Sequence, residues 1–282
     1  FVHTVQFRTG WGGRAWDAQP RAGGGISYDG RLAYYMLIEG AASFVQHHYE
    51  ERFLPNAPES EAFGQARYEN ASAHARLNLA RYVLGAQYAA ERIDSPGDLA
   101  ALHEDPPTSS EQVLHRTDDS VAYLSVDAND VGAWESRYDR NTQGELFLRV
   151  ALRTELNRSA AVAGADGWGN DRRLTYERGN ATSTAWVLHW DDAANATEFE
   201  STFRRYLDAK ATPDDGVWQQ EDGNASYRLQ RLTNRTTVVY LGNESFVRAG
   251  NATGGSDGFV TIEATNASGA GQTRSVRSPS EW

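Results

Sequence analysis

The sequence predicts an α+β fold in which a mostly helical N-terminal region is followed by an antiparallel sheet with packed helices. Up to about residue 117, apolar residues recur every three or four positions, which is the spacing of one helix face. From about residue 119, short stretches alternate between apolar and polar residues, as half-buried strands do. The predicted order of elements in the central part is β-β-α-β-β-β, which favours helices packed on an antiparallel sheet.

The N-terminal helices are separated by residues that end helices. The longest has Asp29 as its expected N-cap and is stopped by Pro55 and Pro58. Residues 10–27 are rich in Gly, and we expect an ordered loop there. The predicted helical segments are 1–8, 29–53, 59–93, 95–103 and 108–115.

The second region combines strands with two helices, over 144–156 and 195–210. The Gly-, Asn- and Ser-rich segment 248–282 is predicted to be an extended tail with an edge strand at 259–264. The chain is thus divided into a helical region (1–117), an α+β region (118–247) and a tail (248–282). The predicted strands of the α+β region are 121–126, 171–178, 184–190, 216–220, 225–232 and 236–241.

Acidic residues dominate the charge of the 282-residue chain. There are 38 Asp and Glu against 27 Lys and Arg, and the net charge is −11, which argues against nucleic acid or anionic lipid as a partner. Only Lys210 is a lysine, against 26 arginines. An acidic, lysine-poor chain is typical of proteins that work in high salt, although an acidic protein from a GC-rich genome would share the arginine bias.

Several kinds of site are excluded by composition. The chain has no Cys, so disulfides, thiolate zinc sites and Cys nucleophiles are absent. No apolar run approaches the roughly 20 residues that span a bilayer, so we expect no transmembrane segment in this chain. Phe1 is not a natural start, and we expect a segment upstream of it.

N-glycosylation acceptors are unusually frequent. Nine of the 14 Asn residues stand in Asn-x-Ser/Thr, and eight of these nine follow residue 150. This density predicts N-linked glycans and an extracellular or cell-surface location. The acceptors are Asn70, Asn157, Asn180, Asn195, Asn224, Asn234, Asn243, Asn251 and Asn266.

Glu39 stands on an otherwise apolar face of the 29–53 helix. A carboxylate in such a place is costly unless it is paired, protonated or bound to a cation. Its partner could be an arginine such as Arg31, which would make it an ion-paired core acid. A lone histidine such as His3 is more often a surface or core residue than a ligand.

Four stretches within roughly 1–210 form a distinctive order of motifs. The first is Phe1-Val2-His3-Thr4-Val5-Gln6, and the second is Asp29 with Leu32-Ala33 and Glu39-Gly40-Ala41-Ala42. The third is Pro106-Pro107-Thr108-Ser109-Ser110-Glu111-Gln112-Val113-Leu114-His115, and the fourth is Gly167-Trp168-Gly169-Asn170-Asp171-Arg172 followed by Trp186–Asp191 and Glu198-Phe199. In this order the motifs resemble a family of gluzincin-type, HExxH zinc-metallopeptidase-like secreted proteins of halophilic archaea.

The resemblance implies a metallopeptidase-like helical region and a zinc site. His3 would be the second histidine of the HExxH helix, and Glu39 the third protein ligand. The first histidine and the general-base glutamate would precede Phe1, so neither is present in this chain. The substrate of a complete site would be a peptide or protein, hydrolysed by zinc-activated water.

Two departures from the family pattern leave the activity open. Either an upstream part supplies the missing His and Glu, or the protein has lost them. The family's Asp after Glu-Gly is Ala41 here, which would weaken support for the ligand helix. His115, four residues after Glu111, could bind a substrate carbonyl or stabilise an oxyanion, but it could equally be a helix cap in a packing motif.

Three functions therefore remain. The first is a secreted zinc peptidase. The second is a non-catalytic surface glycoprotein on a degenerate peptidase scaffold, acting in the cell envelope or in an extracellular assembly, including one of several copies of this chain. The third and weakest is a carbohydrate-binding module, suggested only by eight Trp.

Overall fold

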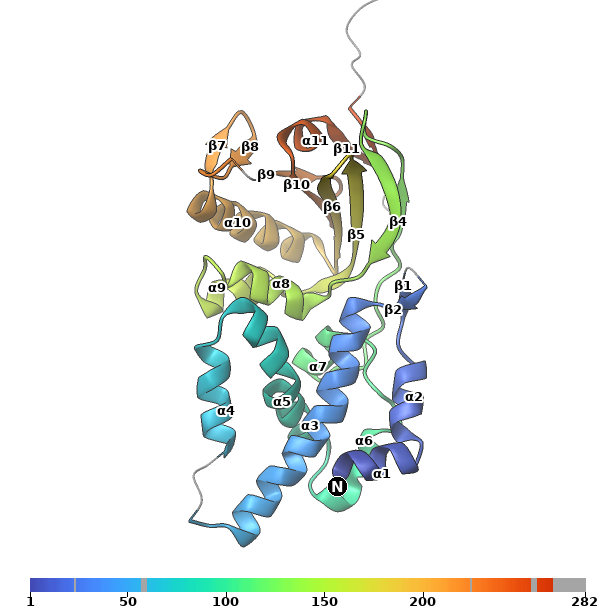
Figure 1. Cartoon of the computed structure of the whole chain (residues 1–282), viewed down its shortest axis with the longest axis vertical. Coiled ribbons are helices and arrows are strands. Elements are labelled where there is room, and N and C mark those ends of the chain that lie inside the picture. The colour runs from blue at the N-terminus through green and yellow to red at the C-terminus, as the bar shows by residue number, and fades with distance from the viewer. Residues whose placement is uncertain (23, 57–59, 224, 255–257, 266–282) are drawn as a thin grey trace, which may run out of the picture.

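The chain forms a helical region and a sheet region that meet along helix α8 (Glu145–Leu152; Figure 1). The computed structural model describes residues 1–22, 24–56, 60–223, 225–254 and 258–265. The arrangement is α+β, with the helices of the first region followed by a seven-stranded antiparallel sheet that carries helices of its own. The predicted fold class is confirmed at this level.

The helical region is organised around two long helices, α3 and α5 (Figure 1). Gly40 of α3 and Gly85 of α5 let the two backbones touch, because a Cβ on either one would collide with the backbone of the other helix. Met36, Leu37 and Tyr88 fill the apolar core beside this contact. The helices of this region are α1 (Val2–Arg8), α2 (Trp11–Asp17), α3 (Tyr28–Phe53), α4 (Ser60–Glu69), α5 (Ala73–Arg92), the 3-10 turn η1 (Pro96–Asp98), α6 (Leu99–Leu102) and α7 (Ser110–His115).

The predicted loop over 10–27 is wrong. Its first half is α2, and Arg21–Ala22 (β1) pairs with Gly25–Ile26 (β2). Gly10 begins α2 with a positive φ of 78°, a conformation that glycine adopts without strain. The two tryptophans hold the helix in place, because Trp16 packs edge-on against Tyr34 and Trp11 stacks on His103.

The cap of α3 also differs from the prediction. Ser27 is the N-cap, and its hydroxyl accepts a hydrogen bond of 3.0 Å from the Gly30 N–H. Asp29 lies in the first helical turn and is buried, where its carboxylate accepts the Ser110 N–H at 3.0 Å. Asp29 therefore ties α3 to α7 instead of capping its own helix. Pro58, the second expected stop of this helix, lies outside the described residues.

The large sheet has the strand order β4-β5-β6-β10-β9-β8-β7. Helices α8 and α10 cover one of its faces, where Leu148 and Phe199 pack with Trp190 of β6, whereas α11 covers the other through Phe246. The elements are β4 (Glu135–Asn141), α8 (Glu145–Leu152), α9 (Arg158–Ala163), β5 (Trp168–Arg178), β6 (Ala181–Trp190), α10 (Ala193–Lys210), β7 (Thr212–Asp214), β8 (Val217–Gln219), β9 (Ser226–Arg231), β10 (Thr236–Gly242) and α11 (Glu244–Ala249).

The predicted tail begins with ordered structure. Gly250–Gly254 (β11) and Phe259–Ala264 (β12) form a small sheet with Ser125–Ala128 (β3), in the order β11-β12-β3. The expected edge strand is thus the central strand of this sheet. The expected strand over 121–126 is wrong in its first half, because β3 begins only at Ser125, where its parallel partner β12 starts.

Asp171 explains the Gly-Trp-Gly-x-Asp-Arg motif structurally. Its buried carboxylate accepts the backbone N–H groups of Gln143 and Gly144 at 2.8 Å each, at the start of α8. It also accepts the indole N–H groups of Trp168 and Trp186 at 3.0 Å each. Four donors satisfy one buried acid, so the motif anchors α8 to the sheet.

Candidate functional site

His3 and Glu39, the two zinc ligands that the family resemblance implies, lie next to each other in the structure. Helix α1 packs across the middle of α3, and the Nε2 atom of His3 lies 3.4 Å from Oε2 of Glu39. The side chains are 46% and 23% exposed, so the pair is open to solvent. Within the described residues Glu39 pairs with His3, and no ion pair joins it to Arg31, the alternative considered above.

A buried glutamine, which sequence reasoning did not select, holds this pair in position. Gln6 is fully buried, and its Nε2 donates to the carbonyl oxygen of Ile38 at 3.0 Å, one residue before Glu39. The same amide nitrogen lies 3.3 Å from Nε2 of His103. Gln6 therefore locks α1 onto α3 at the level of the His3–Glu39 pair.

The hydrogen bonds around Gln6 determine the protonation of two histidine rings. Nδ1 of His103 lies 2.7 Å from the Leu99 carbonyl oxygen and must donate to it. Burial lowers the pKa of His103, so the ring is neutral and its Nε2 accepts from Gln6. The amide oxygen of Gln6 then faces Nδ1 of His3 at 2.9 Å and can only accept, so His3 Nδ1 carries a proton.

As a result, the unprotonated Nε2 of His3 faces the carboxylate of Glu39. In the neutral ring this nitrogen has a lone pair, and it faces a carboxylate oxygen, so the contact is favourable only when a donor or a cation lies between the two acceptors. A second proton on His3, a water molecule or a metal ion can each take that place. A charge-assisted hydrogen bond would be about 2.7–2.9 Å long, whereas two ligands of a tetrahedral zinc lie about 3.3 Å apart given bonds of about 2.0–2.1 Å. The observed 3.4 Å is an ion-pair distance that a shared metal ion would also allow.

The His3–Glu39 pair lacks a third potential metal ligand among the described residues. Over the part of the chain that the structure describes, no third His, Asp or Glu joins His3 and Glu39 within ligating range of one ion. Two protein ligands bind zinc weakly compared with the three that catalytic sites use. The remaining ligand would have to come from another segment.

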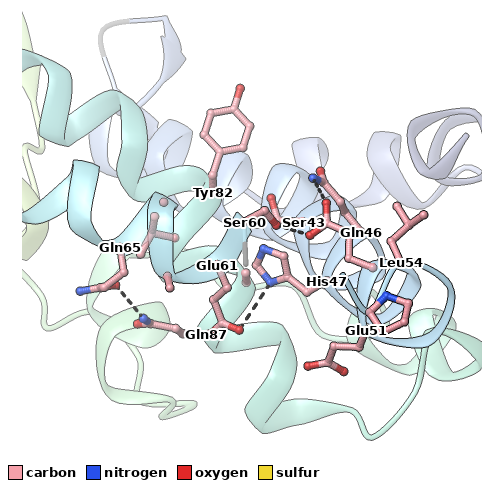
Figure 2. A pocket seen from close by; sticks show the side chains of 16 residues that line it. Ser43, Gln46, His47, Glu51, Leu54, Ser60, Glu61, Gln65, Tyr82 and Gln87 are labelled. Carbon is pink, nitrogen blue, oxygen red and sulfur yellow. Dashed lines mark hydrogen bonds and ion pairs between the residues drawn. The ribbon is translucent and has the colours of Figure 1, made fainter. Parts of the chain in front are cut away.

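A large cavity begins one helical turn beyond Glu39. It has a volume of about 840 Å³ and lies between the second half of α3, α4 and α5 (Figure 2). Its lining contains Glu50, Glu51 and Glu61 and neither Lys nor Arg, although His47 lies 4.0 Å from Glu61. Such a cavity is large enough for a small ligand or a peptide segment.

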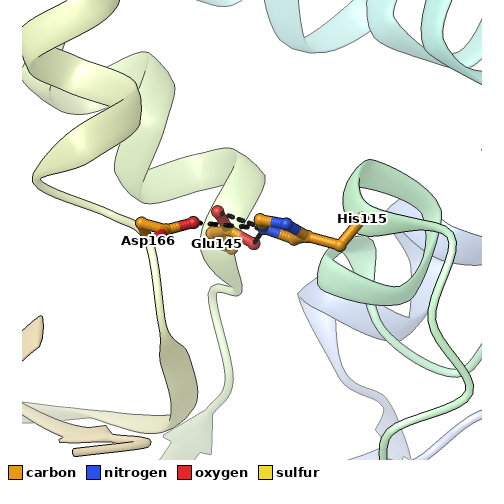
Figure 3. A group of neighbouring side chains, drawn as sticks. All are labelled: His115, Glu145 and Asp166. Carbon is orange, nitrogen blue, oxygen red and sulfur yellow. Dashed lines mark hydrogen bonds and ion pairs between the residues drawn. The ribbon is translucent and has the colours of Figure 1, made fainter.

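His115 belongs to a different group of side chains. Its Nε2 lies 3.0 Å from Oε2 of the fully buried Glu145 and 3.8 Å from Oδ1 of Asp166 (Figure 3). The hydrogen bond to Glu145 raises the pKa of His115. Among the described residues this is the one group of three side chains with metal-ligand spacing, and the site is formed by α7, α8 and the segment before β5.

Arg149 makes a metal ion unfavourable at the His115 group. Its guanidinium contacts Oε1 of Glu145 at 2.5 Å and lies 3.1 Å from Nε2 of His115. A cation already neutralises the buried carboxylate, and a metal ion would have to displace it. The group therefore works as an ionic link between the helical region and the sheet region.

Glu111, the predicted companion of His115, lies among acids. Burial and the nearby carboxylates of Glu145, Asp191 and Asp29 raise the pKa of Glu111 to about 9, so this side chain is protonated at neutral pH. The residues that actually contact His115, Glu145 and Asp166, were not predicted. The only sequence signal for Glu145 was its place in a helical first turn, four residues before Arg149.

The sequons are mostly accessible. Of the seven that fall within the described ranges, Asn70, Asn157, Asn180, Asn234 and Asn243 are exposed, and the other two, Asn195 and Asn251, are half-buried. Asn157 and Asn243 also cap α9 and α11 through their side-chain oxygens. Asn224 and Asn266 lie outside the described residues.

One family model, described as a domain of unknown function (DUF8575), matches residues 131–250. No curated protein and no solved structure matches the chain. The family match covers the seven-stranded sheet and its helices, whereas His3 and Glu39 lie outside it. No helix in the described parts of the chain is both long and apolar enough to cross a bilayer.

Proposed function

We propose that His3 and Glu39 are two of the protein ligands of a zinc site in a secreted, gluzincin-type metallopeptidase-like protein. The observation that carries the proposal is the 3.4 Å approach of an Nε2 lone pair to a carboxylate oxygen, with the other ring nitrogen held by Gln6. An outer partner that fixes the ring in this way is usual for zinc-bound histidine. The metallopeptidase-like character of the helical region belongs to the same proposal.

The HExxH spacing says where the rest of the site would lie. If the helix continues before Phe1, a histidine four residues before His3 lies on the same face, one turn away. A glutamate directly after it completes the HExxH pattern and serves as general base. Zinc held there would polarise a scissile carbonyl and lower the pKa of its bound water. His3 and Glu39 would position the ion, and the 840 Å³ cavity one turn along α3 would accept part of the peptide.

Zinc analysis of the native protein, with the residues that precede Phe1 included, tests the proposal. We expect bound zinc in the wild type and its loss in His3→Ala and in Glu39→Ala. His47→Ala is the matched control, because His47 also faces a glutamate, at 4.0 Å, but without an anchoring glutamine. Zinc retained by Glu39→Ala, or residues other than His-Glu directly before Phe1, would count against the peptidase site.

A second candidate is the non-catalytic surface glycoprotein. Five exposed sequon asparagines on the described surface support it. It predicts glycan on the native protein together with no bound zinc and no hydrolysis of a denatured protein substrate. The mass of native material before and after enzymatic removal of N-glycans tests the glycan part.

A further inference from the structure

A smaller cavity on the same side of α3 has the opposite charge. It has a volume of about 240 Å³ and lies between the first half of α3 and the first half of α5. Two arginines, Arg31 and Arg81, line it, and no Asp or Glu does. This is unusual in a chain where acids outnumber Lys and Arg by 38 to 27.

The two guanidinium groups are held beside aromatic rings. The guanidinium carbon of Arg31 lies 5.5 Å from the ring centre of Tyr28, and that of Arg81 lies 5.3 Å from the ring centre of Tyr35. Asn78 orients Arg81 further, because its backbone and side-chain oxygens accept from Nε at 2.9 Å and Nη2 at 2.5 Å. Stacking covers the flat face of a guanidinium and leaves N–H groups at its edge for a ligand.

Neither arginine has a carboxylate partner among the described residues. The ion pairs of the chain include many arginines, but Arg31 and Arg81 take part in none that the structure describes. The nearest acid in sequence, Asp29, is turned away to the Ser110 N–H. Burial raises the pKa of Tyr28, and the positive charges of Arg31 and Arg81 both oppose that rise, in keeping with their places in one lining.

The other side chains that line the cavity indicate which kind of ligand it would bind. Leu32, Met36 and Leu77 form an apolar wall beside the two tyrosine rings. The volume is below the roughly 300–1,000 Å³ of drug-sized pockets, so it suits a fragment of about one amino-acid residue. A carboxylate with an apolar or aromatic substituent matches both the paired guanidinium groups and the wall, whereas inorganic phosphate would leave the wall unused.

We propose that this cavity binds the carboxylate group of a small ligand with an apolar or aromatic substituent, through Arg31 and Arg81. Tyr28, Leu32, Tyr35 and Glu39 follow one another at helical spacing on the same face of α3. Glu39 is one turn, about 6 Å along the axis, beyond Tyr35. Resting on the proposed function, we assign the carboxylate to the peptide substrate, held beside the zinc site.

Binding to zinc-free protein tests the cavity separately from the zinc site. The full chain, treated with EDTA and kept at one salt concentration, is titrated calorimetrically with N-acetylphenylalanine and with its uncharged amide. We expect the acid to bind at least about tenfold more tightly than the amide, and Arg31→Gln and Arg81→Gln each to weaken acid binding about tenfold. Arg52→Gln is the control, because Arg52 is also exposed and stacks on a ring, that of Phe53, at 5.4 Å.

Three outcomes would overturn the cavity proposal: no binding of the acid, equal binding of acid and amide, or wild-type affinity in both arginine variants. The side chain of Arg31 makes no hydrogen bond or ion pair that the structure describes, so its variant should fold normally, which circular dichroism checks. Because the assay contains no zinc, a negative result leaves the zinc proposal standing. Conversely, if the protein binds no zinc but binds the acid through both arginines, the zinc proposal fails and the carboxylate site in the cavity stands.

Discussion

Gln6 and His3 share a hydrogen bond of 2.9 Å that decides which nitrogen of His3 faces Glu39. Both ends of the Gln6 amide are used, because its nitrogen is committed to the Ile38 carbonyl and to His103. The oxygen is therefore the atom left for His3. By accepting the Nδ1 proton of His3, Gln6 leaves the lone pair of the neutral ring on Nε2, the nitrogen that faces Glu39.

Replacing Gln6 tests this positioning role. Gln6→Leu keeps both proposed ligands but removes the partner of His3 Nδ1, so we expect zinc affinity to fall about 10–100-fold. The change also leaves the Ile38 carbonyl and His103 without their donor, which should lower the free energy of unfolding by about 1–3 kcal/mol. Zinc titration and urea unfolding measure the two effects. Gln46→Leu, at an exposed position on α3, is the control and should change neither. Unchanged zinc affinity in folded Gln6→Leu would contradict the role.

The close approach of α3 and α5 predicts a strong effect of a single methyl group. In Gly40→Ala the new Cβ would meet the backbone of Gly85, which cannot move without separating the helices. We expect destabilisation of about 1–3 kcal/mol or more, as for overpacked cores. Gly13→Ala in α2 is the matched control, because nothing lies within 4 Å of its added Cβ. That variant should be neutral or more stable by up to about 1 kcal/mol, since alanine favours the helix. Urea denaturation of both variants gives the comparison.

The four donors around Asp171 predict that its indole partners matter for stability. Trp168→Phe removes one N–H donor at 3.0 Å from the buried carboxylate and preserves most of the ring volume. Because hydrogen bonds to charged groups contribute about 1.5–3 kcal/mol, the free energy of unfolding should fall by about that amount. Trp134→Phe is a suitable comparison, since its indole donates to the neutral hydroxyl of Ser245 at 3.2 Å. Equal losses in the two variants would show that the charge of Asp171 is irrelevant.

Glu111 predicts a pH dependence of stability opposite to that of most carboxylates. Its pKa is raised to about 9 in the folded protein, so the folded state keeps a proton that the unfolded state loses above about pH 4.5. Stability should therefore fall as the pH rises from about 4.5 to 9. Glu111→Gln mimics the protonated acid, so its stability relative to wild type should rise across this range and match wild type below pH 4. Thermal unfolding at a series of pH values measures this, with the exposed Glu104→Gln expected to follow wild type throughout.

Helical spacing and turn residues were enough to predict the long helices, the main strands and their α+β order. These signals are local, because the spacing of apolar residues and the residues that begin and end an element lie within or beside that element. Two predictions, the loop over 10–27 and the extended tail from 248, were wrong because contacts with distant parts of the chain order these segments. Trp11–Asp17 form α2, where Trp11 and Trp16 pack against His103 and Tyr34, which are distant in sequence. Likewise β12 is ordered because β3, more than 120 residues earlier, pairs with it, and β11 pairs with the other edge of β12.

The sequence by itself, through its resemblance to a family, was enough to suggest that His3 and Glu39 belong together. Its composition determined the acidic net charge of the chain. Only the tertiary structure decided how the pair is presented. Gln6 and His103 come from helices far apart in the chain, and their hydrogen bonds depend on three-dimensional contact that no spacing rule contains. The same holds for His115, whose buried partner Glu145 lies 30 residues away. Long-range hydrogen bonds between buried polar groups form only when packing excludes water from both partners, so they follow from the fold and not from the local sequence.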